Sequence, residues 1–379
     1  MAERVVLVAI GRKISGRRFL NEQAEEMKEL VRSANGSLVV EMTVMIDRPS
    51  PSHYIHRGKV AELGVMCRAK RADLAIFSVD LSPVQARNLE SACGTRIVDR
   101  TGLILDIFAR RAQSREGRLQ VELAQLNYLL PRLVGKGVLL SRLGGGIGTR
   151  GPGEQKLEVD RRQIRNRIAR IKGELEKVIR HRELLRQSRK RKDFQVVAIV
   201  GYTNAGKSSL LNALTGSNAF VEDKLFATLD PTTRVFVTKN SKKILLTDTV
   251  GFLQNLPHHL IEAFKATLEE VREADALVHV MDVADPFVEE HFRVVNQLLA
   301  DLDALHKPTV VALNKIDLLT LDDRKRMEEK FPGGVLVSVK ERLNFSQLAV
   351  HLDCILNHDM HKTLNSELEH AESSDCIID

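Results

Sequence analysis

The chain has 379 residues, of which 43 % are hydrophobic and 4 % aromatic. That length suits roughly two to three domains, and that apolar content suits buried cores and argues against wholesale disorder. The four widely spaced cysteines and the lack of CxxC spacing favour a reduced, cytoplasmic protein without a structural zinc site. No apolar run approaches 18 residues and no signal-peptide core is evident, so we expect neither a transmembrane helix nor secretion.

The net charge of +7 conceals a split between the two halves of the chain. Residues 1–192 carry 39 Lys and Arg against 21 Asp and Glu, whereas residues 193–379 carry 18 against 29. A basic half joined to an acidic half indicates a polyanionic partner for the basic half. Nucleic acid is the commonest such partner, and an anionic membrane surface is the alternative.

The first 110 residues alternate short apolar runs with helical patterns. Strands are predicted over 5–10, 37–45 and 74–79, and helices over 19–32, 59–69 and 83–92. That order predicts a small N-terminal α/β domain over 1–110 with a largely parallel sheet. The pair Gly58-Lys59 precedes a predicted helix, but no glycine-rich loop comes before it, so we do not assign it to phosphate binding.

Residues 111–192 predict a basic helical hairpin. Two leucine- and isoleucine-rich seams with steps of three and four residues predict two packed helices: Leu119, Leu123, Leu126, Leu130 and Leu133, then Ile164, Ile168, Ile171, Leu175 and Val178. Between them, Gly135–Gly153 holds eight glycines and predicts a long loop at the tip of an antiparallel pair. Residues 161–192 carry 14 Lys or Arg against three Glu, which favours a surface that meets phosphates, with a plain charged linker as the alternative.

From residue 193 onward, strands and helices alternate again. Apolar runs over 195–200, 243–247, 276–281 and 309–313 are typical of buried strands, and the last helix is predicted over 345–356. This predicts a second α/β domain over 193–357, with a mostly parallel sheet and helices on both faces. Residues 358–379 are polar and acidic, and we expect a flexible tail.

A phosphate-binding loop directly follows the predicted strand 195–200. Its residues fit the P-loop pattern GxxxxGK[ST]: Gly201, Tyr202, Thr203, Asn204, Ala205, Gly206, Lys207 and Ser208. In this pattern, backbone N–H groups and a helix N-terminus converge on the phosphates. Lys207 would contact the β- and γ-phosphates, and the Ser208 hydroxyl would bind Mg²⁺. The sequence therefore predicts a P-loop nucleotide domain with Mg²⁺ as its cofactor.

A DxxG motif ends the predicted strand 243–247. It consists of Asp248, Thr249, Val250 and Gly251, about 40 residues after the P-loop lysine. At the carboxyl end of a strand, an aspartate can reach Mg²⁺ through a bound water, and the Gly251 N–H can meet the γ-phosphate.

An NKxD motif follows the predicted strand 309–313. It consists of Asn314, Lys315, Ile316 and Asp317. The Asp317 carboxylate can accept from guanine N1–H and the exocyclic amine together, a donor pair that adenine lacks. Asn314 would contact the N7/O6 edge, and the Lys315 stem would cover the base. In this order, the three motifs predict a guanine-nucleotide-binding protein that hydrolyses GTP to GDP and phosphate.

The chain resembles the HflX family of translation-associated GTPases, within the wider Obg-HflX group, over nearly its whole length. Residues 141–154 resemble the family's glycine-rich signature, and residues 226–231 resemble its switch I. The switch I residues assigned to nucleotide binding are Phe226, Ala227, Thr228, Leu229 and Asp230. By this resemblance, Thr228 binds Mg²⁺ and the γ-phosphate. The fifth guanine loop, with backbone contacts to O6, would be Ser338, Val339 and Lys340. The family commonly has Ala in the middle position, so Val339 is a departure.

The resemblance also implies a partner. Family members bind the ribosome, chiefly the large subunit, and are similar to factors that separate stalled or idle ribosomes. The basic hairpin would meet ribosomal RNA, and we expect a monomer. A GTP-switched RNA-binding assembly factor is the alternative, and residues 314–317 disfavour an ATP-using kinase. The family often carries a further C-terminal domain; because a short acidic tail follows the last predicted helix here, that domain's functions are not carried over.

Phe252 follows the DxxG motif, where Ras-like proteins place the glutamine that orients the attacking water. A phenyl ring cannot do this by hydrogen bonding, so we expect slow intrinsic hydrolysis that another agent completes. The ribosome is one candidate. The other is K⁺, held beside the phosphates by Asn204, although a loop asparagine that binds its own backbone is an equal alternative. The predicted catalytic residues are thus Lys207, Thr228, Gly251 and Asn204.

Overall fold

The structure, a computed structural model, describes residues 2–13, 16–133, 152–190, 194–216, 225–226, 229–238, 241–254 and 265–357. The predicted tail 358–379 and the predicted glycine-rich loop, up to residue 151, lie outside these ranges. Contacts divide the chain into two compact units: Met1–Glu183 with 224–226 and 257–264, and the remaining residues. Within the described ranges, each helix is too short or too polar to span a membrane.

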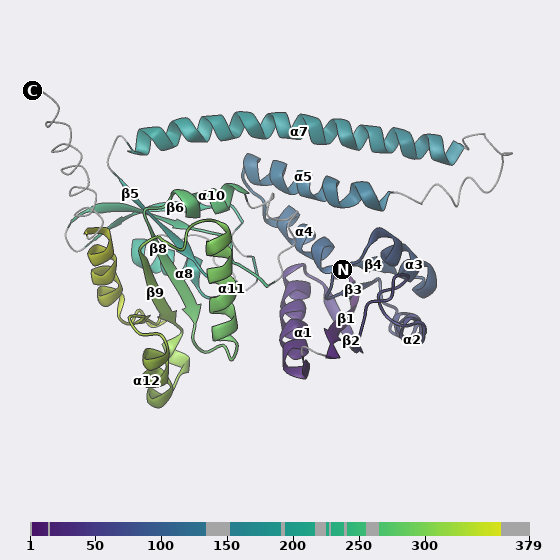
Figure 1. Cartoon of the computed structure of the whole chain (residues 1–379), viewed down its shortest axis with the longest axis horizontal. Coiled ribbons are helices and arrows are strands. Elements are labelled where there is room, and N and C mark those ends of the chain that lie inside the picture. Colours follow the sequence, from purple (N-terminus) through teal and green to yellow (C-terminus); the bar gives the residue numbers. More distant parts are fainter. Residues whose placement is uncertain are drawn as a thin grey trace, which may run out of the picture. The chain divides into compact units, whose positions relative to one another are not determined.

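The first unit is built on a four-stranded parallel sheet with the order β2-β1-β3-β4. Its strands are β1 (Arg4–Arg12), β2 (Ser37–Ile46), β3 (Leu74–Phe77) and β4 (Arg96–Val98), joined by α1 (Gly16–Ser33), α2 (Arg57–Ala69) and α3 (Pro83–Cys93) (Figure 1). The three predicted strands and three predicted helices are confirmed, with bounds shifted by at most three residues. The edge strand β4 was not predicted, because three residues are too few to show a period.

The ends of α3 show how local sequence sets these bounds. The Ser82 hydroxyl accepts from Gln85 N–H while the Gln85 side chain accepts from Ser82 N–H, so two amides that the helix leaves unpaired are satisfied. The helix stops at Gly94, which has a φ of +67°. That left-handed conformation favours glycine.

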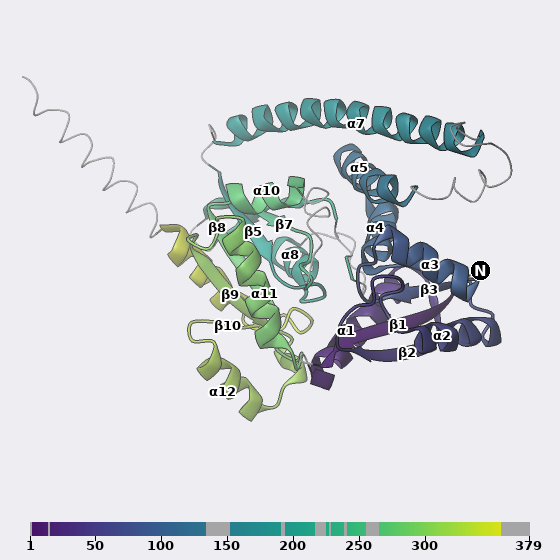
Figure 2. The ribbon, with the colours of Figure 1, turned by 45° about the vertical axis from the view of Figure 1, so that its right-hand side comes forward.

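After α4 (Arg100–Arg111), the hairpin consists of α5 (Arg115–Arg132) and α7 (Pro152–Lys190), and Figures 1 and 2 both show α7 running beside α5. The predicted seam is confirmed for six side chains, which form one cluster: Leu119, Leu123, Leu126, Ile168, Ile171 and Leu175. Helix α7 starts at Pro152, so the last two residues of the predicted loop are helical instead. Proline suits a first helical position because the amide it lacks would have no partner there.

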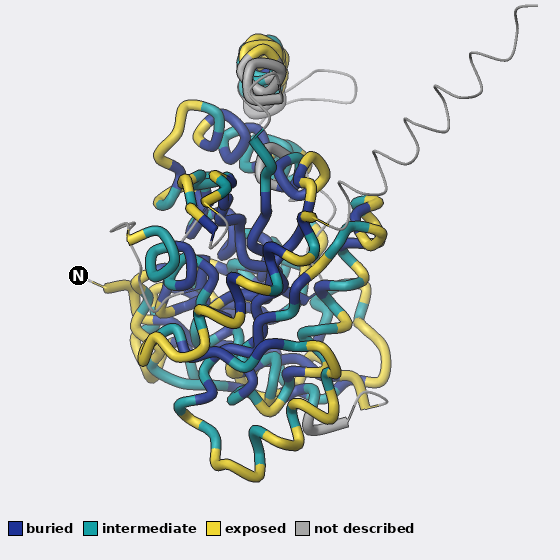
Figure 3. Tube along the Cα trace, turned by 90° about the vertical axis from the view of Figure 1, so that its left-hand side faces the viewer, coloured by how far each residue is buried: buried dark blue, intermediate teal, exposed yellow. Residues whose placement is uncertain are grey.

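The second unit holds a six-stranded sheet with the order β10-β9-β8-β5-β7-β6, parallel except for β6. The strands are β5 (Gln195–Val200), β6 (Thr232–Val237), β7 (Lys243–Asp248), β8 (Ala276–Asp282), β9 (Thr309–Asn314) and β10 (Val335–Leu336). The helices are α8 (Lys207–Thr215), α10 (Lys265–Glu273), α11 (Val288–Asp301), α12 (Leu321–Lys330) and residues 345–357. In Figure 3, the buried residues, coloured dark blue, lie mainly on the strands and on the inner sides of helices, and the exposed residues, coloured yellow, lie mainly on the outer turns and loops. The predicted α/β class, with its parallel-dominated sheet, is confirmed.

Candidate active site

The P-loop joins the end of β5 to α8, as the sequence predicted. Gly201 has a φ of +152° and Gly206 a φ of +96°. A Cβ at Gly201 would lie 2.2 Å from the carbonyl oxygen of Val280, and one at Gly206 would lie 2.4 Å from Asn314 Nδ2. Only glycine fits either position without moving the neighbouring chain, so both glycines are required by the loop's shape.

Lys207, the first residue of α8, is 6 % exposed. Its Nζ donates to the carbonyl oxygen of Tyr202 at 2.7 Å. Burial lowers the pKa of Lys207 to about 8, although the charge of Asp248 acts in the opposite direction. A phosphate at this amine would replace the carbonyl as acceptor and favour the charged form.

Ser208 and Asp248 meet across the P-loop. The register of β5 with β7 pairs Ile199 with Asp248, which brings the strand ends together. The Ser208 hydroxyl donates to Asp248 Oδ2 at 2.6 Å, and Asp248 is 2 % exposed. Hydroxyl and carboxylate oxygens are the hard donors that Mg²⁺ prefers, so the residues present fit this ion. Thr249, next along, donates its hydroxyl to Ile199.

Gly251 lies against the P-loop. A Cβ there would lie 2.7 Å from Thr203 Cγ2 and 3.0 Å from Lys207 Nζ, so a side chain would collide with the loop. Val250 and Phe252 on either side are 2 % and 1 % exposed. The Phe252 ring therefore belongs to the core, whereas the backbone of Gly251 lies next to the predicted phosphate position.

Asn314 joins the P-loop to the predicted fifth guanine loop. It is 2 % exposed, its Nδ2 donates to the carbonyl oxygen of Ala205 at 2.8 Å, and its Oδ1 accepts from Val339 N at 3.1 Å. The sequence predicted a contact with the N7/O6 edge of the base. In this structure both polar groups bind the protein backbone, so that contact stays a prediction.

The other NKxD residues hold the neighbouring loops in place. Lys315 adopts a φ of +68°, and its Nζ lies 2.6 Å from Asp282 Oδ2. Asp317 Oδ1 accepts from the Ser338 hydroxyl at 2.6 Å, and Ile316 is buried. The structure thus brings 314–317 beside 338–340, where Val339 is half-buried and Lys340, the last residue of the predicted site, is exposed.

The predicted switch I residues are divided between the two compact units, because Phe226 belongs to the first and residues 229–230 to the second. Ala227 and Thr228 lie outside the described residues, and Leu229 and Asp230 precede β6. Phe226 groups with the first unit, is 2 % exposed, and packs edge-on against Phe108 with ring centroids 4.6 Å apart. Its ring makes a hydrophobic contact here, and its contact with nucleotide stays a prediction.

Asn204 lies exposed in the P-loop with a φ of +61°, a left-handed conformation that asparagine tolerates better than most residues. Sequence reasoning missed two histidines beside this loop. His279 in β8 is 2 % exposed, and its pKa is lowered to about 3 by burial and then by the charge of Lys207. The ring of His291 in α11 stacks on Tyr202. Neither histidine belongs to a motif, so the sequence held no signal for them.

Known proteins match this chain along its length. Residues 21–109 match the family described as GTP-binding GTPase N-terminal, residues 111–189 its Middle Region, and residues 196–315 the 50S ribosome-binding GTPase family. A crystal structure of SsGBP with GDP aligns with a TM-score of 0.53 at 26 % identity, covering 94 % of this chain and 99 % of that one.

Curated relatives agree with these matches. The chain is 53 % identical over 350 residues to GTPase HflX of Caldanaerobacter subterraneus subsp. tengcongensis, covering 91 % of this chain and 79 % of the relative. It is 46 % identical over 329 residues to GTPase HflX of Escherichia coli, covering 86 % and 77 %. Together with the loop geometry, these matches show that the chain is a GTP-hydrolysing member of the HflX family of P-loop GTPases.

Proposed function

We propose that this chain is a ribosome-associated GTPase that binds the large subunit through its basic hairpin and separates or remodels stalled or idle ribosomes. The family description of residues 196–315 as a 50S ribosome-binding GTPase supports the partner. The observation that carries the RNA-binding part is that the cations of α7 fall into two sets.

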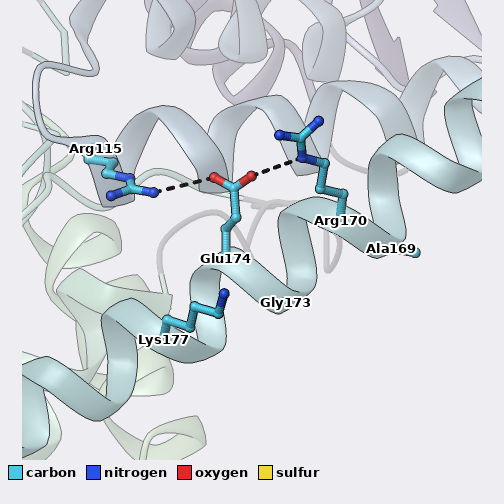
Figure 4. Close-up of a pocket in the computed structure, with 6 residues that line it drawn as sticks. All are labelled: Arg115, Ala169, Arg170, Gly173, Glu174 and Lys177. Carbon is cyan, nitrogen blue, oxygen red and sulfur yellow. Dashed lines mark ion pairs between the residues drawn. The ribbon is translucent and has the colours of Figure 1, made fainter.

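One set is paired with carboxylates along the seam. Both nitrogens of the Arg167 side chain that face Glu122 lie within 2.7 Å of its oxygens, and Arg182 lies 3.2 Å from Glu116. Glu174 lies between Arg115 at the start of α5, at 3.6 Å, and Arg170, at 3.3 Å (Figure 4). The pairs of Arg167, Arg182 and Arg115 connect α5 with α7, whereas Arg170 pairs with Glu174 within α7, so these arginines support the hairpin.

The other set lies away from the seam. Five exposed cations of α7 have no ion pair with any residue that the structure describes: Arg162, Arg165, Lys172, Lys177 and Arg180. All but Lys177 share one side of the helix. At 3.6 residues per turn, these four fall within about 80° of one another on α7, and each lies about 100° or more from Ile171. Glu176 shares that sector. Glu158, one turn before Arg162, falls in it too, so over 162–180 the sector holds four cations and one carboxylate, an excess of positive charge that suits a string of phosphates.

Hydrolysis is assigned to the residues around the P-loop. The Lys207 amine binds phosphate oxygens in place of the Tyr202 carbonyl, and the Gly251 N–H meets the γ-phosphate. Mg²⁺, held by the Ser208 and Thr228 hydroxyls, supplies positive charge at the phosphates when bound. Asp248 orients the Ser208 hydroxyl. Asn204 is the candidate ligand for K⁺: single-turnover rates that are equal in K⁺ and Na⁺ at matched ionic strength would leave the ribosome as the activator.

The division of cations is tested with two variants of equal charge. One replaces Arg162, Arg165, Lys172 and Arg180 with Gln; the other replaces Arg115, Arg167, Arg170 and Arg182. We expect the first to weaken co-sedimentation with ribosomes and to flatten its salt dependence, by about 0.7–0.9 in log–log slope per lost phosphate contact. The second should mainly lower the melting temperature. Equal effects of both variants on the slope would contradict the proposed surface.

A GTP-switched assembly factor is the second candidate, because a basic hairpin on a GTPase suits either role. Sucrose-gradient profiles of ribosomes with GTP and with a non-hydrolysable analogue separate the two. Free subunits that accumulate with GTP support splitting, whereas binding without subunit release supports the assembly factor. We further propose that the protein is a cytoplasmic monomer. Light scattering after size-exclusion chromatography would check the monomer, and vesicle flotation would test the alternative of membrane contact.

A further inference from the structure

Tyr202 in the P-loop contacts the segment that follows the DxxG motif. Two backbone hydrogen bonds join the segments: Phe252 N donates to Gly201 O at 3.1 Å, and Thr203 N donates to Phe252 O at 2.9 Å. A third bond uses a side chain, since Gln254 N donates to the Tyr202 hydroxyl oxygen at 3.2 Å. Residues 252–254 are therefore fastened to the P-loop, in part by a phenol.

His291 holds that phenol in place. The rings of His291 and Tyr202 stack with centroids 3.7 Å apart and planes 10° apart, and Tyr202 is 8 % exposed. His291 Nδ1 lies 3.7 Å from Asp285 Oδ2. The cavity beside the rings measures about 60 Å³ and is also lined by Asn204 and His279. That space holds a few waters at most, so the Tyr202 ring cannot swing far.

The segment that Tyr202 holds is next to the phosphate position. Gly251 immediately precedes Phe252, and its backbone is already pressed against Thr203 and Lys207. A shift of a few tenths of an ångström at 252–254 would move the Gly251 N–H relative to a phosphate bound at Lys207. The buried Phe252 ring offers no hydrogen bond to the reaction, so this segment acts there through its backbone donors, whose placement affects the rate steeply.

We propose that His291 is a positioning residue for GTP hydrolysis. By stacking on Tyr202, it fixes the hydroxyl oxygen that receives the Gln254 N–H, and it thereby sets the position of the Gly251 N–H. His291 lies 43 residues after Asp248 on a helix that carries no GTPase motif. The assignment concerns the hydrolytic site alone and is independent of the ribosome.

The test compares three variants of the full chain in single-turnover GTP hydrolysis and in GTP and GDP binding. Tyr202→Phe keeps the stack but removes the acceptor oxygen, His291→Ala removes the stack, and His291→Phe restores a flat ring. We expect the hydrolysis rate to fall about five- to tenfold in Tyr202→Phe and His291→Ala, the size expected from one lost hydrogen bond. Affinities should stay within about twofold, and His291→Phe should recover most of the rate.

Val295→Ala is the control for a purely structural role. Val295 is fully buried one turn further along α11 and lies outside the stack, so its truncation lowers stability at a comparable depth. We expect Val295→Ala to lower the melting temperature but to hydrolyse GTP at the wild-type rate. A wild-type rate in Tyr202→Phe, a rate loss in Val295→Ala equal to that of His291→Ala, or no recovery in His291→Phe would each overturn the proposal.

Discussion

Two aspartates end parallel strands, one in each unit, and each is 2 % exposed: Asp99 after β4 and Asp248 at the end of β7. Asp99 Oδ1 accepts from Gly102 N at 2.8 Å and the Tyr128 hydroxyl at 2.7 Å. Its Oδ2 accepts from Leu81 N at 3.2 Å and Arg132 at 2.6 Å. Asp248, by contrast, accepts from a P-loop hydroxyl and lies near a lysine whose pKa burial has lowered.

The difference lies in whether the donors can change partners. Burial and then the Asp99 charge raise the pKa of the Tyr128 phenol, so Tyr128 keeps its proton and donates it in a hydrogen bond to Asp99. A Cβ at Gly102 would lie 2.7 Å from the Tyr128 hydroxyl oxygen, so Gly102 and Tyr128 pack closely around the same carboxylate oxygen. Four protein donors make Asp99 a structural clasp that joins α5 to the sheet. Ser208 and Lys207, in contrast, offer donors that a phosphate and a metal ion can use.

The largest effect is expected from exchanging both aspartates in turn. Asp248→Asn should slow hydrolysis on the order of 100-fold, because the Ser208 hydroxyl loses a charged acceptor, with little change in the free energy of unfolding. Asp99→Asn should cost about 2–4 kcal/mol of stability, since Arg132 loses its charged partner, with the rate per folded molecule unchanged. Urea unfolding and single-turnover kinetics measure the two; the reverse pattern would contradict the comparison.

Asp317 is intermediate between Asp99 and Asp248. Its Oδ1 accepts a hydrogen bond from the Ser338 hydroxyl within the protein. If guanine donates its two N–H groups to the remaining acceptor sites of this carboxylate, Asp317→Asn should weaken GTP binding by about 2–4 kcal/mol, the size of a lost charge-assisted pair. The affinity of the variant for xanthosine nucleotides should rise, because the side-chain amide of the introduced asparagine can donate to the xanthine oxygen that replaces the guanine amine. Binding isotherms for both nucleotides check this, and unchanged GTP affinity would argue against base recognition by Asp317.

The pH dependence of unfolding tests the buried histidine behind the P-loop. The pKa of His279 is about 3 in the folded chain, against an ordinary value near 6.5. As pH falls below 6.5, the unfolded chain takes up the proton first, so this group removes stability at up to about 1.4 kcal/mol per pH unit. The slope of unfolding free energy between pH 6 and pH 4 should be smaller in His279→Phe. Parallel slopes would show that His279 is charged when folded.

The smallest effect concerns Lys207, whose pKa of about 8 is set by burial. At pH 8.5 most free molecules have a neutral amine, whereas phosphate favours the charged one. GDP binding at that pH should therefore take up part of a proton, and binding at pH 7 almost none. Calorimetry in two buffers of different ionisation enthalpy measures this uptake, and zero uptake at pH 8.5 would mean an ordinary lysine.

Features that depend on residues close together in the chain could be predicted from the sequence. The seam of α5 and α7 follows from apolar spacing, and the P-loop glycines follow from backbone angles that other residues rarely adopt. Edge strand β6 was missed because its side chains are half-exposed and its pairing with β7 is antiparallel. The stack of Tyr202 on His291 joins residues 89 apart in the chain. Such contacts arise from the folded sheet and leave no local pattern.

Helix α7 is much longer than the helix it packs against. Its 39 residues span about 58 Å, whereas the 18 residues of α5 span about 27 Å. The seam uses Ile168, Ile171 and Leu175 from the middle of α7, and like-charged neighbours such as Arg161 and Arg165 repel one another. Amide hydrogens near the ends of α7 should therefore exchange with solvent sooner than those around Ile171. A bound polyanion would relieve the repulsion and slow that exchange, so the helix would gain order as its partner arrives.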